Sequence, residues 1–213
     1  MGGGRLKGRP VAVSNGMENS TEPVGATRAN RAAAAFGMLS IVVSLGAIGV
    51  AMLLSVRFSM ATSALSDLGR AGWTTTAVFN GGLLVAGLLA LPLGIVLARN
   101  ARTLLHAAGS VAFSLSAVCL SLVGVFALPA PEHGLVAIGF FLAFTVAFVL
   151  YGAGDVRTGA RGRGLATLAL ALVHVLGWVV WLGAGTPGGL AIPELVGSAC
   201  LSAWVLATAA RLW

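Results

Sequence analysis

Charged residues are scarce in this chain. Only 9% of its 213 residues are Asp, Glu, Lys or Arg, against roughly 25% in a soluble domain, and 58% are hydrophobic. The mean hydropathy is +0.97. A chain with so few polar side chains cannot cover a folded surface exposed to water. The composition therefore excludes a soluble globular domain and predicts that lipid surrounds most of the chain.

Cysteines and recognisable reaction motifs are scarce as well. The two cysteines, Cys119 and Cys200, each lie inside an apolar run, which excludes a disulfide framework and a thiolate metal site. The sequence contains no H-E-x-x-H, no G-x-S-x-G and no phosphate-binding glycine loop followed by Lys. The motifs that identify the common hydrolase and nucleotide-binding classes are thus missing.

The excess of positive charge does not indicate a nucleic-acid-binding protein. The formal charge is +7, but five of the thirteen basic residues lie within residues 1–31, and most of the others lie in short connections between apolar runs. Such placement orients a membrane protein and contacts anionic headgroups, and it offers no folded basic surface to a duplex. We expect a lipid bilayer as the main partner and no nucleic acid.

Six apolar runs are long enough to cross a membrane as helices. A helix needs about 20 residues, at 1.5 Å each, to cross roughly 30 Å of hydrocarbon. We predict an all-α integral membrane protein, with a six-transmembrane-helix bundle in residues 32–213 after a disordered cytoplasmic tail in residues 1–31. The predicted spans are residues 32–56, 76–97, 104–126, 134–151, 165–182 and 192–210.

Arginine placement gives the expected orientation. Eight arginines lie beside the tail, the second and fourth connections and the end of the sixth span, whereas only Arg57 and Arg70 lie on the other side. Cytoplasmic connections carry the excess of Lys and Arg, so both termini are expected in the cytoplasm and the protein in the cell membrane. Small residues at four-residue spacing, such as Ser198 and Ser202, allow close helix contacts and permit a homo-oligomer.

The expected outer face carries nearly all the ionisable chemistry outside the tail. Its members are Asp67, Glu132, His133 and Glu194, joined by Asn80 about one turn into the second span. Polar residues at the membrane edge are candidates for a functional site. His133 can titrate near neutral pH, bind a metal or donate a hydrogen bond to a phosphate.

Each of these residues also has a structural interpretation. Glu132 and Glu194 each follow a proline in the first turn of a helix, where the helix dipole favours an acid. Asp67 lies in the longest outer loop, where we expect a short helix that ends at Gly69. His133 is equally suited to a helix start, and Asn80 to a hydrogen bond with a neighbouring helix.

His174 is the one ionisable residue near the middle of a predicted span. It should face the bundle interior as a neutral, hydrogen-bonded side chain. A proton relay needs further titratable groups at that depth, and the sequence supplies none.

Several short runs resemble a known prokaryotic membrane family, the one defined by domain of unknown function 998. They are SALSDLG at 63–69, FNGGL at 79–83, VGVF at 123–126, HGL at 133–135 and IPEL at 192–195. The resemblance extends over residues 32–213 and implies a six-helix bundle. It adds Ser66 to the outer-face candidates and supports Asp67, Asn80 and His133. It implies no activity.

Three functions fit these observations. The leading hypothesis is a membrane protein without catalytic activity and without a cofactor. It would bind a lipid headgroup or a small ligand at Ser66, Asp67, Asn80, His133 and Glu194. The alternative is a membrane-embedded hydrolase in which His133 and Asp67 bind a divalent metal that activates water against a lipid-borne bond. The third is a structural or assembly subunit.

Overall fold

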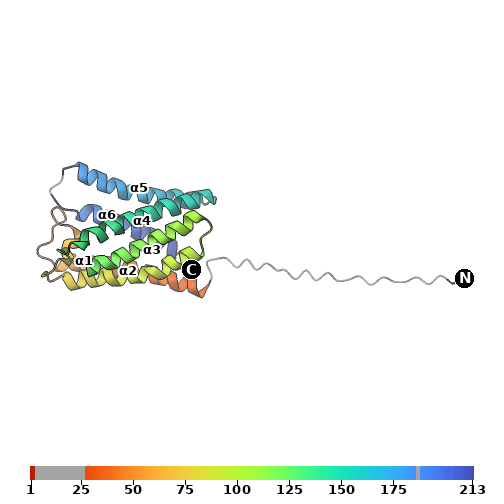
Figure 1. The fold of residues 1–213 in the computed structure, drawn as a ribbon, viewed down its shortest axis with the longest axis horizontal. Coiled ribbons are helices and arrows are strands. Elements are labelled where there is room, and N and C mark those ends of the chain that lie inside the picture. Colours follow the sequence, from red (N-terminus) through yellow and green to blue (C-terminus); the bar gives the residue numbers. More distant parts are fainter. Residues whose placement is uncertain (3–26, 186–187) are drawn as a thin grey trace.

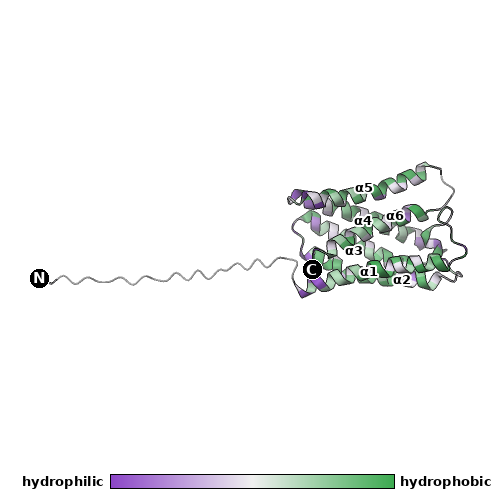
Figure 2. Cartoon of the chain, turned by 180° about the vertical axis from the view of Figure 1, so that it is seen from behind, coloured by the Kyte–Doolittle hydropathy of each residue, from purple (hydrophilic) through white to green (hydrophobic). Residues whose placement is uncertain are grey.

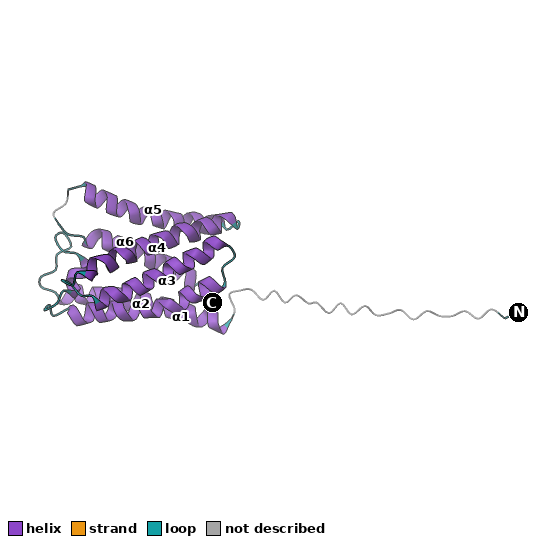
Figure 3. Ribbon diagram, viewed as in Figure 1, coloured by secondary structure: helices purple, strands orange, loops and turns teal. Residues whose placement is uncertain are grey.

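A computed structural model describes residues 1, 2, 27–185 and 188–213. Most of the predicted tail, residues 3–26, lies outside the described residues. The described chain is all-α and contains no strand (Figure 3). Its elements follow in the order α1 Arg28–Leu54, the 3₁₀ helix η1 Leu65–Gly69, α2 Thr76–Arg99, α3 Leu104–Val125, α4 Glu132–Arg157, α5 Arg161–Gly183 and α6 Ala191–Ala209 (Figure 1).

Each of the six long helices is long and apolar enough to cross a membrane. Hydrophobic residues run along their length, and hydrophilic residues gather mainly at their ends (Figure 2). Many large apolar side chains, such as Leu53, Leu135 and Val180, are exposed on the outside of the bundle. Because lipid is the solvent that accommodates such a surface, the prediction of a multi-pass membrane protein is confirmed.

The helices match the predicted spans within two residues except at three ends. Helix α1 begins at Arg28, four residues before the predicted start, so residues 28–31 of the predicted tail are helical. Helix α4 continues to Arg157, six residues beyond the predicted end, and α5 begins at Arg161, four residues before the predicted start. Hydrophobicity falls where the lipid ends, whereas a helix ends only where its backbone hydrogen bonds end. All three helices therefore extend past the apolar runs. The expected short helix before Gly69 is present as η1.

Each long helix contacts the next one in the chain, and α6 contacts α1, so that the helices form a closed ring. Phe113, Phe148 and Trp204 fill the centre of the ring near its middle, with ring centroids 5.3–5.5 Å apart. Helix α5 lies at the periphery against α4 and α6, and it buries few of its residues. Its contact with α4 depends on two facing glycines, because a Cβ at Gly164 would lie 2.6 Å from the carbonyl oxygen of Gly152.

The two ends of the bundle differ in character. At the end where α1 begins and α6 ends, here the terminal end, Arg31 Nε donates to the carbonyl oxygen of Trp213 at 3.2 Å. The connection between α2 and α3 lies at this end too, since Asn100 hydrogen-bonds Asn30 at 3.3 Å. The other end, here the η1 end, carries η1 and the longest connection. The first and last spans, α1 and α6, lie side by side.

Candidate functional site

Asp67 closes its own turn in η1. Its Oδ2 accepts a hydrogen bond from the backbone N–H of Ala64 at 2.9 Å, and its Oδ1 accepts from both Nη2 and Nε of Arg70 at 2.5 and 3.2 Å. The carboxylate therefore caps the 3₁₀ helix and pairs with a neighbouring arginine three residues later. This is the loop role that the sequence offered as one of two interpretations.

Asn80 connects α2 to the end of η1. Its Nδ2 donates to the carbonyl oxygen of Gly69 at 2.8 Å, and the side chain is buried. The same loop is held from α2 a second time, because Thr75 Oγ1 donates to the carbonyl oxygen of Leu68 at 2.6 Å. The buried backbone carbonyls at the end of η1 are thereby satisfied.

Glu194 holds the beginning of η1 from the first turn of α6. Its carboxylate is 7% exposed, accepts from the backbone N–H of Leu65 at 2.5 Å and also interacts with the backbone N–H of Ser66. The start of α6 makes a second contact with this loop, because the backbone N–H of Ala191 donates to the carbonyl oxygen of Ser63 at 2.9 Å. A residue 129 positions away in sequence thus fixes the loop to the bundle.

His133 lies apart from these contacts, at the start of α4. Its Nδ1 is 2.7 Å from the carbonyl oxygen of Phe126, which makes Nδ1 the protonated nitrogen in this contact. The side chain is 5% exposed, and Nε2 has no hydrogen-bond partner among the described residues. The histidine thus links the end of α3 to the start of α4.

The predicted site residues therefore gather at one end but do not form one pocket. Ser66 and Glu194 line the same cavity, whereas Asp67, Asn80 and His133 do not line it. Within residues 27–185 and 188–213, no three His, Cys, Asp or Glu side chains are grouped as metal ligands would be. A metal site at His133 and Asp67 stays a prediction from the sequence.

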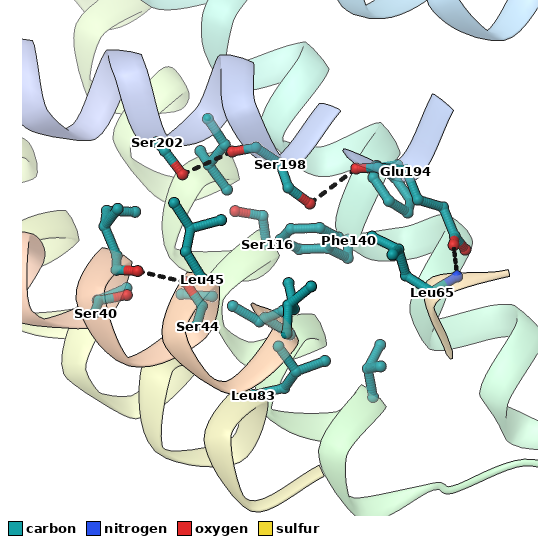
Figure 4. Close-up of a pocket in the computed structure, with 18 of the residues that line it drawn as sticks. Ser40, Ser44, Leu45, Leu65, Leu83, Ser116, Phe140, Glu194, Ser198 and Ser202 are labelled. Carbon is teal, nitrogen blue, oxygen red and sulfur yellow. Dashed lines mark hydrogen bonds between the residues drawn. The ribbon is translucent and has the colours of Figure 1, made fainter. Parts of the chain in front are cut away.

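The cavity lies inside the bundle, between η1 and the middle of the membrane span, and has a volume of about 80 Å³ (Figure 4). Side chains of η1 and of every long helix except α5 line it. Phe79, Phe113 and Phe140 in its lining are all buried. Since one water needs roughly 10–15 Å³, the volume is several times that minimum.

Serines of α1, α3 and α6 line the cavity, yet their hydroxyl protons are already donated to backbone carbonyl oxygens. Ser40 Oγ donates to the carbonyl oxygen of Ala86 at 2.8 Å, and Ser116, Ser198 and Ser202 donate to carbonyl oxygens of their own helices. The remaining wall is almost entirely aliphatic and aromatic. A water molecule inside would find few donors and acceptors, so the middle of the cavity favours an apolar occupant.

Sequence reasoning did not identify Asp155, although its carboxylate contacts two basic side chains in the structure. It lies near the end of α4 at 3% exposure, paired with Arg163 at 2.7 Å and within 3.3 Å of His106 Nε2. The available signal was its position as the one carboxylate outside the tail on the arginine-rich side.

The expected environment of His174 was half right. The side chain is buried, at 3% exposure, and faces the interior. It stacks on Phe141 with centroids 5.6 Å apart and contacts Phe144 at 4.6 Å, and its Nδ1 has no partner among the described residues. The expected hydrogen bond is not made to any described residue, and Nδ1 faces Gly197 on α6, where a Cβ would lie 2.7 Å from it.

Comparison with known proteins gives one result. A family model described as protein of unknown function DUF998 matches residues 38–211, which spans α2 to α6 and most of α1. No curated protein and no solved structure matches the chain.

Proposed function

The chain belongs to the DUF998 family, whose description assigns no activity, and we propose from its geometry that it binds one apolar chain of an amphiphilic molecule inside the bundle. The observation that carries the proposal is the cavity, which is apolar in its middle and ends at two polar side chains, Ser66 and Glu194. An amphiphile has the same order of chemistry, a tail followed by a polar head.

The entrance favours a ligand that arrives from the membrane. Leu45 on α1 is the most exposed residue of the lining, at 37%, and Ser44 and Ser198 beside it are half-buried. These residues lie on the two helices that close the ring, α1 and α6 (Figure 4). An acyl or isoprenoid chain could therefore slide between α1 and α6 without leaving an apolar medium.

The chemistry at the η1 end favours a head group that donates hydrogen bonds. The Glu194 carboxylate accepts from the backbone N–H groups of Leu65 and Ser66, and a carboxylate has about four acceptor positions in all. The Ser66 hydroxyl makes no hydrogen bond to a described residue and lines the cavity. A hydroxyl or amine head finds acceptors there, so this end of the cavity is suited to an alcohol or an amine.

We further propose that the terminal end faces the cytoplasm, with eight arginines at that end against two at the η1 end. Cysteines placed at the exposed positions 71 and 158, with Cys119 and Cys200 replaced by Ala, test this on intact cells. A membrane-impermeant maleimide should label Ala71→Cys and should label Thr158→Cys only after lysis. The opposite pattern would reverse the orientation.

Photo-crosslinking tests the cavity. A long-chain alcohol with a diazirine in its chain is added to the purified full-length protein in a mild detergent, and labelled peptides are identified by mass spectrometry. Labelling is expected on α1 and α6 at the cavity and should fall to background in Ser198→Leu, which fills the space. The matched control is Ala199→Leu, because Ala199 is exposed and points away from the cavity.

Equal labelling in the two variants would overturn the proposal, and it would favour the structural-subunit alternative. The head group is tested by Glu194→Gln, which removes the charge and keeps an acceptor for the Leu65 N–H. This variant should reduce labelling by an amine-headed probe more than labelling by the alcohol. No difference between the two probes would place the head elsewhere.

A further inference from the structure

A second, polar pocket lies at the terminal end of the bundle, far from the cavity. It has a volume of about 340 Å³ and is formed by the end of α2, the connection after it, α3, α4, α5 and the end of α6. Its charged side chains are Arg102, Asp155, Arg163 and Arg211. No residue of the proposed outer-face site belongs to it.

The base of this pocket is an ion pair between the buried carboxylate of Asp155 and the exposed guanidinium of Arg163. Both oxygens of Asp155 are occupied by Arg163, with Nη2 at 2.7 Å and Nε at 3.2 Å. His106 approaches the same carboxylate at 3.3 Å, and its other ring nitrogen lies 3.0 Å from Thr103 Oγ1. The bidentate contact fixes the plane of the Arg163 guanidinium, whose side chain is 41% exposed.

The walls are held by close packing. His106 meets Tyr151 edge to face, with centroids 4.8 Å apart, and Tyr151 meets Trp204 in the same way at 5.5 Å. Gly154 makes room for the histidine, because a Cβ there would lie 2.9 Å from His106 Nε2. Tyr151, Asp155 and Arg163 are therefore mounted on helices, as a preformed binding site requires, and Arg102 and Arg211 lie within a few residues of helix ends.

Donors in the pocket are left without acceptors. Arg102 makes no hydrogen bond or ion pair to any described residue, and the Tyr151 hydroxyl makes no hydrogen bond to one. Arg102, Arg163, Arg211 and Asp155 line the same pocket as Tyr151. Three arginines against one aspartate leave an excess of two positive charges among these four residues.

The arginines also repel one another. Burial, and after it the charge of Arg163, lower the pKa of the Arg211 guanidinium from its usual value. Arg211 Nη2 has only a neutral partner, the Thr208 hydroxyl at 2.9 Å. The carboxylate of Asp155 is already paired with Arg163. A bound anion would therefore stabilise the remaining positive charges of the cluster.

From this arrangement we infer that the terminal-end pocket is a binding site for a phosphate group, held by Arg102, Arg211 and the Tyr151 hydroxyl with Arg163 as a fixed neighbour. Several guanidinium donors and one hydroxyl converge on one space, which matches the several oxygens of a phosphate better than the two of a carboxylate. Asp155 and His106 position Arg163 and do not contact the ligand.

The phosphate could belong to a lipid headgroup or to a soluble molecule, and two arms of one experiment separate these sources. The full-length protein is placed in nanodiscs of phosphatidylcholine alone. Inorganic phosphate is titrated at constant ionic strength in the first arm, and thermal stabilisation is followed. In the second arm, phosphatidic acid is included in the nanodiscs, and native mass spectrometry counts the retained molecules.

The variants distinguish a site from general attraction to a basic surface. Saturable binding of one phosphate group per chain is expected in one arm, and Arg102→Gln with Arg211→Gln should weaken it at least about tenfold, because each change removes a charge-assisted hydrogen bond. The matched control is Arg99→Gln with Arg157→Gln, two exposed arginines at the same end that line no part of the pocket.

Folding of each variant is checked by monodisperse elution and by its melting temperature without phosphate. The control pair should bind within about twofold of the parent, since it changes only screened surface charge. An equal loss in both pairs would show that the attraction is unspecific and would overturn the inference. Absence of saturable binding in both arms would overturn it as well.

Discussion

The contact between α4 and α5 gives a prediction whose size follows from the structure. In Gly164→Ala, the new Cβ would lie 2.6 Å from both the carbonyl oxygen of Gly152 and Cγ2 of Val156, and 2.8 Å from the backbone nitrogen of Val156. Two of these atoms are backbone, so the helices must move apart. Overpacking of this kind costs about 1–3 kcal/mol.

A matched control stands two residues earlier on the same helix. A Cβ at Gly162 would meet nothing within 4 Å, so Gly162→Ala should gain about 0.5–1 kcal/mol from the lower flexibility of alanine in the unfolded chain. That gain is similar in both variants and largely cancels between them. The difference in unfolding free energy, about 1–3 kcal/mol, then measures the α4–α5 contact alone.

Thermal unfolding in detergent, followed by tryptophan fluorescence, measures this difference. At roughly 2–4 °C per kcal/mol for a chain of this size, Gly164→Ala should melt about 2–12 °C below Gly162→Ala. Trp178 and Trp181 lie on α5 and report its separation from the bundle directly. Equal melting temperatures, or a more stable Gly164→Ala, would refute the close contact on which the position of α5 rests.

Three further predictions concern the η1 end. Glu194→Ala should lower the unfolding free energy, measured by chemical denaturation, by about 1–3 kcal/mol, because it leaves the buried backbone N–H of Leu65 unpaired. Glu132 is exposed, so the unfolding free energy of Glu132→Ala should stay within about 0.5 kcal/mol of the parent in the same assay. Asp67→Ala removes the η1 cap and should speed limited proteolysis of that loop relative to the parent, at a cost of about 0.5–2 kcal/mol. Protein purified without chelator should carry less than about a tenth of an equivalent of zinc or manganese by elemental analysis. A full equivalent that disappears in His133→Ala would instead favour the hydrolase.

The membrane fold could be predicted because lipid imposes a simple demand. A span must be a helix of about 20 apolar residues, and each of the six runs meets that length. The same demand says nothing about where a helix ends outside the lipid. For that reason the extension of α4 to Arg157 and of α5 to Arg161 was missed.

The polar residues of the η1 end were predicted by type and by side, but their partners were not. Glu194 binds a backbone N–H 129 residues away, and His133 binds a backbone carbonyl at the end of the preceding helix. Such partners depend on how a loop settles on the bundle. Spacing within one segment carries no information about that.

The cavity and the terminal-end pocket were beyond sequence reasoning for different reasons. The cavity results from small residues on separate helices, such as Ser40, Ser116 and Ser198, facing one another. Each of them looks like ordinary helix packing in its own segment. In the pocket, the arginines were interpreted only as signs of orientation, because nothing in the sequence placed Arg102 beside Arg211 and Tyr151.

Helix α6 contributes to both internal spaces at once. Its first half supplies Glu194, Ser198 and Ser202 to the cavity, and its end supplies Thr208 with Arg211 just beyond it to the pocket. During synthesis the earlier spans enter the membrane first. Neither space has all its walls until the sixth span docks between α5 and α1, so a chain stalled before that step would carry neither. The same late step, the docking of the sixth span, thus completes the walls of both spaces.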